Sequence, residues 1–160
     1  FMRIIRILDF IKTGKFGDIE VGQTKEYVGA NFPPPDDTWD DGKGISIWEY
    51  GRLEFHFFDE VLITIWCDWL ECIADTEKFS LDIWQLNNLD KLTLPYVCSE
   101  FDKLTIHYSK KETRYSDKPL PDNVILNIAD NVVMYFEDKK ELETSTDDYY
   151  LIAIGAVNKD

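Results

Sequence analysis

Two histidines, His56 and His107, are the side chains best suited to proton transfer in this sequence. Each lies in a strand-like stretch, His56 in residues 52–57 and His107 in residues 104–108. Because an imidazole titrates near neutral pH, either one could act as the general base of a hydrolase. No nucleophile motif or phosphate-binding glycine loop accompanies them in the sequence. A strand histidine that faces solvent or a neighbouring acid is the preferred interpretation, and no catalytic residue is assigned.

Metal and redox chemistry have little support in the spacing of the cysteines and acids. Cys67 and Cys72 form a C-x4-C pair without a second pair or a nearby histidine, which argues against zinc. The aspartates of residues 36–41 lack the spacing and the terminal glutamate of a calcium loop. With Cys98 the cysteines form no disulfide framework, which is typical of reduced thiols. We therefore expect no cofactor, no metal and a cytoplasmic protein.

The charge balance narrows the classes of partner. The chain carries 31 acidic and 17 basic residues, a formal net charge of −14, and both halves are acidic. Such a surface repels the phosphates of nucleic acids and of anionic membranes, and it attracts basic proteins. We therefore expect a protein partner, no nucleic acid and no membrane. The competing interpretation is that the acidity serves only solubility.

An acidic segment is the first candidate for partner binding. Residues 36–44 follow three prolines, and they are expected to form a polar loop that steers a partner toward the protein and pairs with its lysines or arginines. The four candidate residues are Asp36, Asp37, Asp40 and Asp41.

Aromatic side chains supply the second set of candidates, because tryptophan and tyrosine are favoured as interface anchors. Trp48 and Tyr50 share one face of an expected strand, and Trp66 shares a face of a third strand with Thr64. His56 lies on the polar side of the strand between them. We assign these four side chains to an exposed partner-binding surface. In the alternative, Trp48 or Trp66 belongs to the core, because the registers between strands cannot be read from the sequence.

The elements that position these residues follow from periodicity and turn signals. Thr24 is the expected N-cap of a short helix that ends before the prolines of residues 33–35. Strands are predicted at residues 19–22, 45–50, 52–57 and 61–67. Leu53, Phe55 and Phe57 alternate with polar residues, which is typical of an antiparallel sheet covered on one face. The predicted fold class is α+β, with short helices packed on antiparallel sheet.

The second half of the chain echoes the first. Residues 93–101 match residues 24–32 at four positions, and residues 133–138 resemble residues 54–59. We predict one compact domain over residues 1–160. After an N-terminal amphipathic helix at residues 2–13, it would hold two repeats, at residues 17–75 and 90–157, that share one sheet. The extra length of the second repeat is placed in the loop of residues 110–122, and a last strand spans residues 149–157. The alternative is that two short helices with ordinary core residues look alike.

One repeat resembles a known family. Residues 21–24 (VGQT), a short helix, Pro33, residues 47–51 (IWEYG) and residues 53–57 (LEFHF) look like a unit of the β-lactamase-inhibitory-protein-like superfamily. The resemblance implies helices packed on a small antiparallel sheet whose exposed face binds protein. It does not extend to inhibition of a β-lactamase, because the secretion signal, lipid-attachment cysteine and disulfides of relatives are not visible here.

These observations favour a protein that binds another protein over an enzyme. An acidic, cytoplasmic unit of this type is similar in class to bacterial immunity proteins, whose targets include basic nucleases. The leading hypothesis is an immunity-type inhibitor that neutralises a basic bacterial toxin through an acidic, aromatic surface. The alternatives are a scaffolding protein that self-associates through its sheet face and a hydrolase that uses His56 or His107.

Overall fold

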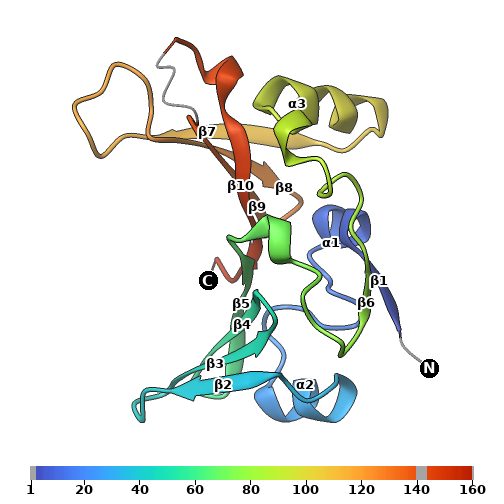
Figure 1. Cartoon of the computed structure of the whole chain (residues 1–160). Coiled ribbons are helices and arrows are strands. Elements are labelled where there is room, and N and C mark those ends of the chain that lie inside the picture. Colours follow the sequence, from blue (N-terminus) through green and yellow to red (C-terminus); the bar gives the residue numbers. More distant parts are fainter. Residues whose placement is uncertain (1–2, 140–143, 160) are drawn as a thin grey trace.

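One eight-stranded antiparallel sheet forms the centre of the molecule, and the three α-helices of the described chain lie on one side of it (Figure 1). The computed structural model describes residues 3–139 and 144–159. The strand order is β2-β3-β4-β5-β10-β9-β8-β7. The predicted fold class, α+β with short helices on antiparallel sheet, is confirmed.

The elements of the first half are β1 (Ile4–Arg6), α1 (Ile7–Thr13), α2 (Lys25–Asn31), β2 (Asp37–Asp40), β3 (Ile45–Tyr50), β4 (Leu53–Phe58), β5 (Val61–Cys67) and the 3-10 helix η1 (Leu70–Cys72). Those of the second half are β6 (Ser80–Asp82), η2 (Leu89–Lys91), α3 (Leu94–Lys103), β7 (Tyr108–Thr113), β8 (Asn123–Ile128), β9 (Val132–Glu137), η3 (Thr146–Asp148) and β10 (Tyr150–Val157). Strands β1 and β6 pair in parallel as a separate short sheet.

The two halves contribute equivalent elements to the sheet in reverse spatial order. Strands β2 to β5 run from one edge to the centre, and β10 to β7 continue from the centre to the other edge. Thr24 and Thr93 cap α2 and α3 by the same bond, each side chain accepting from the backbone N–H three residues later. Each threonine also makes a backbone bridge to the start of the half's last strand, at Val61 and Tyr150. Two copies of one unit would give this arrangement, and a repeat origin stays a prediction.

The core fills the space between the helices and the sheet. The predicted alternation along β4 is confirmed, since Leu53, Phe55 and Phe57 are fully buried while the residues between them are not. Phe16 packs its ring against several aromatic neighbours, including Phe55 and Phe79, at centroid distances of 6.1 and 5.4 Å. Burial of each such ring contributes about 2 to 3 kcal/mol, so the helix-facing side of the sheet is fixed firmly.

Three predicted elements differ from the structure. The helix expected at residues 2–13 begins only at Ile7, and Ile4 lies on β1, where it is exposed. The apolar residues there have helical spacing, but the β-branched Ile4 and Ile5 form a strand that pairs with β6. Met2, the first residue of the predicted helix, lies outside the described residues. Residues 19–22 form a single bridge and a turn. The acidic loop of residues 36–44 contains β2, because its backbone pairs with β3.

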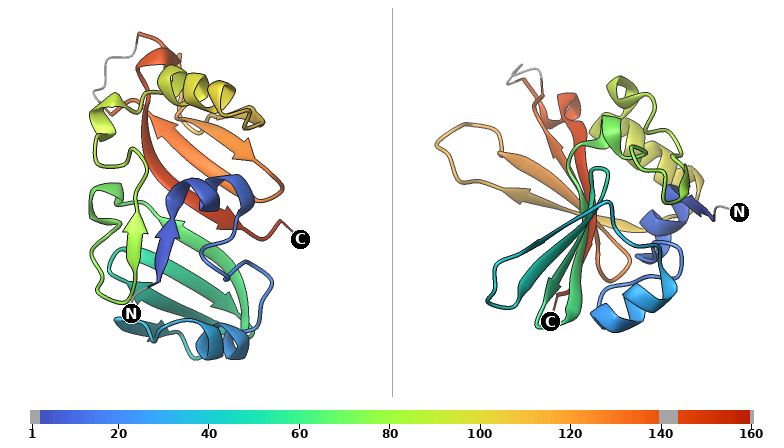
Figure 2. Two further views of the ribbon diagram at one scale, coloured as in Figure 1. Left: turned by 90° about the vertical axis from the view of Figure 1, so that its right-hand side faces the viewer. Right: turned by 60° about the horizontal axis from the view of Figure 1, so that its bottom comes forward.

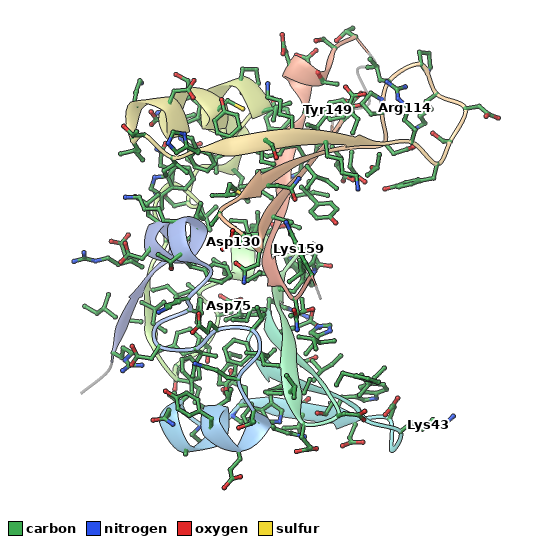
Figure 3. The ribbon with its side chains drawn as sticks, turned by 180° about the vertical axis from the view of Figure 1, so that it is seen from behind. Lys43, Asp75, Arg114, Asp130, Tyr149 and Lys159 are labelled. Carbon is green, nitrogen blue, oxygen red and sulfur yellow. The ribbon has the colours of Figure 1, made fainter. Side chains whose placement is uncertain are left out.

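The sheet is curved, and its two end hairpins project away from the helices. The turn between β2 and β3 and the longer loop between β7 and β8 both extend to the side opposite the helices (Figures 1 and 2). Seen from behind, Lys43 marks the tip of the first hairpin and Arg114 the base of the second (Figure 3). The side of the sheet that no helix covers therefore lies between the β2–β3 hairpin and the β7–β8 hairpin.

The turn between β3 and β4 depends on a glycine for two separate reasons. Gly51 has φ of 60°, and a Cβ there would lie 2.1 Å from the backbone oxygen of Asp75. Gly42 has a similar φ of 72° but open space around its Cα. We expect Gly42→Ala to cost about 1 to 2 kcal/mol from backbone strain alone, and Gly51→Ala about 2 to 5 kcal/mol because the clash adds to it. Urea unfolding of the two variants tests this, and equal losses would contradict it.

Candidate protein-binding face

The side of the sheet that faces away from the helices, here called the open face, carries the polar set of each alternating strand. His56 on β4 and Trp66 on β5 lie on it, between buried residues that point to the helices. In the second half Tyr135 and Ile125 lie on the same side, opposite each other on β9 and β8. The pairing of β5 with β10 makes the two halves of this face continuous.

Three carboxylates are aligned directly across neighbouring strands of the open face. Asp37 pairs with Glu49, and Glu49 pairs with Glu54. Directly opposed residues of antiparallel strands have Cβ atoms about 5 Å apart, and like charges in such pairs are destabilising. Among the described residues no lysine or arginine forms a salt bridge with any of the three. We call this set the carboxylate row.

His56 lies beside the carboxylate row. Its Nε2 atom is 3.7 Å from Oε2 of Glu54, beyond hydrogen-bond distance. That nitrogen is buried and has no hydrogen-bond partner in the described part of the chain. Buried polar atoms are nearly always hydrogen-bonded in folded proteins. Because this atom is shielded from solvent, a group on the open face could reach it only if neighbouring side chains moved.

Apolar side chains flank the carboxylate row. Trp66 continues it on β5, opposite both Glu54 and Gly155, and its ring packs edge-on against Tyr135 with centroids 5.4 Å apart. A Cβ at Gly155 would lie 2.5 Å from the Trp66 ring, so the glycine allows the indole to lie close over β10. On the other side Trp39 is 53% exposed. The open face thus combines negative charge with aromatic area.

The structure contradicts two of the predicted site residues. Tyr50 is fully buried, and its hydroxyl donates a 2.7 Å hydrogen bond to the carbonyl oxygen of Pro33. Burial, assisted by the charge of Asp36, raises the pKa of the Tyr50 phenol. Trp48 packs on Phe57 with ring centroids 4.9 Å apart, on the helix-facing side. Both assignments were wrong because the alternation along β3 has the opposite phase, with Trp48 and Tyr50 pointing toward α2 and the core.

The four aspartates separate into different roles. Asp36 accepts hydrogen bonds from Gly51 N–H at 2.8 Å and from the Thr76 hydroxyl at 2.7 Å, so it joins the β3–β4 turn to a distant loop. Asp40 and Asp41 accept from backbone N–H groups of their own turn, which they stabilise. Only Asp37 belongs to the carboxylate row.

Sequence reasoning missed Glu49 of the row and Trp39 of the acidic segment, and it placed Glu54 on the polar side of its strand without assigning it to the site. Glu49 lies in a stretch that reads as apolar, and its alignment with Glu54 requires the β3–β4 register. The short turn at Gly51 could have revealed this alignment. A two-residue turn fixes the register of a hairpin, and a turn at residues 51 and 52 places Glu49 opposite Glu54. Trp39 gave no strand signal because aspartates surround it.

The predicted enzymatic residues do not come together. His56 is on β4 and His107 immediately precedes β7, with four strands between them in the sheet. Five steps of about 4.8 Å separate those strands by roughly 24 Å, so the histidines cannot share a reaction centre. Burial raises the pKa of the Cys67 thiol to about 12, which keeps it un-ionised at neutral pH. Within residues 3–139 and 144–159 no cluster of three metal-ligating side chains is found.

Comparison with known proteins returns no family model, no curated protein and no solved structure that matches this chain. The resemblance to the β-lactamase-inhibitory-protein-like superfamily therefore stays a prediction. No helix in the described ranges is long and apolar enough to cross a membrane.

The different roles of two adjacent aspartates can be separated by mutation. Asp36→Ala leaves the Gly51 N–H and the Thr76 hydroxyl without their acceptor, and we expect a loss of about 1 kcal/mol or more in unfolding free energy. Asp37→Ala removes an exposed carboxylate that bonds only the N–H of Thr38 and is repelled by Glu49, so its change should stay within about 0.5 kcal/mol. Urea unfolding at low salt measures both. An equal loss in the two variants would refute the assignment.

Proposed function

We propose that this chain is an immunity-type inhibitor that binds and neutralises a basic bacterial toxin through the open face. The carboxylate row is the observation that carries this proposal. Three like charges held opposite one another cost the free protein stability, and a cationic partner would relieve that repulsion. The net charge of −14 adds long-range attraction for such a partner.

The apolar part of the open face supports a macromolecular partner. Exposed aromatic and aliphatic residues lie beside the acids on the open face, among them Phe58, 48% exposed, and Ile45, 40% exposed. These two residues are directly opposed on β4 and β3. A protein surface can bury such groups and pair the carboxylates in one contact, as buried anchors within a polar rim do at other interfaces.

The two alternative functions gain less support. Self-association through the open face by two-fold symmetry would bring two carboxylate rows toward each other, which is unfavourable. A hydrolase that uses His56 or His107 is the other alternative. The two histidines are too far apart in the sheet to act together, and the Glu54 carboxylate lies 3.7 Å from Nε2 of His56, beyond hydrogen-bond distance. The absence of an ionised cysteine at Cys67 removes one nucleophile as well.

The direct test is to recover the partner from the source cell. We expect the tagged chain, expressed in its native host, to retain one basic protein in stoichiometric amount at physiological salt and to release it at high salt, where the attraction is screened. The purified partner should be toxic in a bacterial expression test and lose that toxicity when this chain is co-expressed. Recovery of a partnerless chain, or of a partner without toxicity, would contradict the proposal.

The carboxylate row makes a second prediction, in which stability and binding change in opposite directions. Glu49→Gln combined with Glu54→Gln should raise the free energy of unfolding by about 0.5 to 1 kcal/mol at low salt and weaken binding to the captured partner by about tenfold or more. The matched control removes two exposed acids outside the open face, with Glu26→Gln on α2 and Asp90→Asn on η2.

Urea unfolding and surface-based binding kinetics measure the two effects. In the control pair we expect no gain in stability and a smaller, mainly association-rate loss. If the row variant binds as tightly as the parent chain, or loses stability, the row does not form the interface.

A further inference from the structure

The second half of the sheet has a feature without a counterpart in the first. The connection between β7 and β8, residues 114–122, is longer than the turn between β2 and β3, residues 41–44. It encloses a pocket of about 290 Å³ against the ends of β8, β9 and β10. The top of Figure 3 shows this region, with Arg114 and Tyr149 labelled. We call it the loop pocket.

Two side chains that line the loop pocket lie on the same side of the sheet as the carboxylate row. Asn123 and Glu137 line it. Asn123 precedes Ile125 by two residues and Glu137 follows Tyr135 by two, so all four side chains share one face. A partner that covers the open face can therefore reach the pocket.

Hydrogen bonds hold the loop in one conformation. The Asp122 carboxylate accepts from the backbone N–H groups of Tyr115 and Ser116, at 2.7 and 3.1 Å, and from the Ser116 hydroxyl at 2.7 Å. Arg114 donates to the Pro119 carbonyl at 3.0 Å. Both oxygens of the Asp122 carboxylate therefore accept hydrogen bonds within the loop, and these bonds order the pocket wall before any ligand binds.

Tyr115 is an aromatic ring that is fixed in place and still exposed. It is 76% exposed, the largest value among the exposed large apolar side chains of the described residues. Its hydroxyl nevertheless donates a hydrogen bond to Oδ1 of Asn123, whose side chain is only 7% exposed. A ring held at its tip with its face toward solvent is a platform on which a cation can stack.

The electrostatics of the loop pocket favour a cation. Glu137, Asp138 and Asp122 line it, and Lys118 is the basic residue among its described lining. Burial raises the pKa of the neighbouring Tyr149 phenol, and the charges of Asp138 and Asp122 raise it further. The Glu137 side chain forms no salt bridge within the described chain.

We propose that the loop pocket binds an arginine side chain presented by the basic partner, with the guanidinium stacked on Tyr115 and paired with Glu137. A planar guanidinium can stack on a ring and form two parallel hydrogen bonds with one carboxylate, whereas a lysine ammonium cannot do both. The inference rests on the proposed function, because it names an anchor within that interface.

The pocket can be tested without the partner. The probes are N-acetyl-arginine amide, N-acetyl-lysine amide and the uncharged N-acetyl-citrulline amide, titrated into the isotope-labelled full chain and followed by NMR. We expect shifts at Tyr115 and at the Asn123 side-chain amide, with the arginine compound binding several-fold more tightly than the lysine compound and the citrulline compound not binding. Equal binding by citrulline, or shifts confined to other regions, would overturn the assignment.

Variants identify the contacts. Glu137→Gln and Tyr115→Leu should each weaken binding of the arginine compound by about tenfold, and Glu26→Gln on α2 should leave it unchanged. An unchanged affinity in both pocket variants would overturn the proposal, and their spectra report whether the fold is kept.

If the captured partner binds the double pocket variant as tightly as the parent, the pocket is not its anchor and the proposed function still stands. If arginine binds the pocket but no partner is captured, the proposed function fails and the pocket remains a cation site.

Discussion

The pairing of β5 with β10 is the constraint on which the rest of the architecture depends. It joins two four-stranded halves in one antiparallel register, with Cys67 opposite Ile154 and Thr64 opposite Val157. Because the side chains of a sheet alternate strictly, this register decides that the buried sets of both halves face the helices together. A shift of one residue would turn one buried set toward solvent. The continuous core and the continuous open face are therefore two results of one pairing.

The open face carries a conflict that the fold does not resolve within the chain. Its acids are aligned across β2, β3 and β4 by the same ladders that stabilise the sheet, so they cannot move apart without loss of backbone hydrogen bonds. Buried helix-facing residues on β3 and β4 offset this cost, whereas β2 is exposed along its whole length and is held by its ladder with β3. Natural proteins commonly place such unfavourable local arrangements at sites of function. The orphaned Nε2 atom of His56 lies in the same place.

The sequence was informative where one residue type determined one structural outcome. The Thr24 N-cap, the proline stop after α2 and the alternation along β4 each have a local physical cause, and the structure agrees with them. The phase of β3 was not accessible, because Ser46, Trp48 and Tyr50 on one side and Ile45, Ile47 and Glu49 on the other are both mixed sets. The acidic segment could not be recognised as β2, since aspartates disfavour strands and only pairing with β3 specifies one there. Cross-strand alignment, which creates the candidate site, is a property of registers and not of any single segment.

Carboxylate footprinting of the captured complex would show directly whether the carboxylate row lies in the interface. The free and bound forms would be labelled with a water-soluble carbodiimide and an amine, and the modified residues quantified by mass spectrometry. We predict that Asp37, Glu49 and Glu54 lose reactivity in the complex while Glu26 on α2 keeps it. Protection of the acids on the helix side with the carboxylate row still reactive would refute binding through the open face, because the partner would then occupy the opposite side of the molecule.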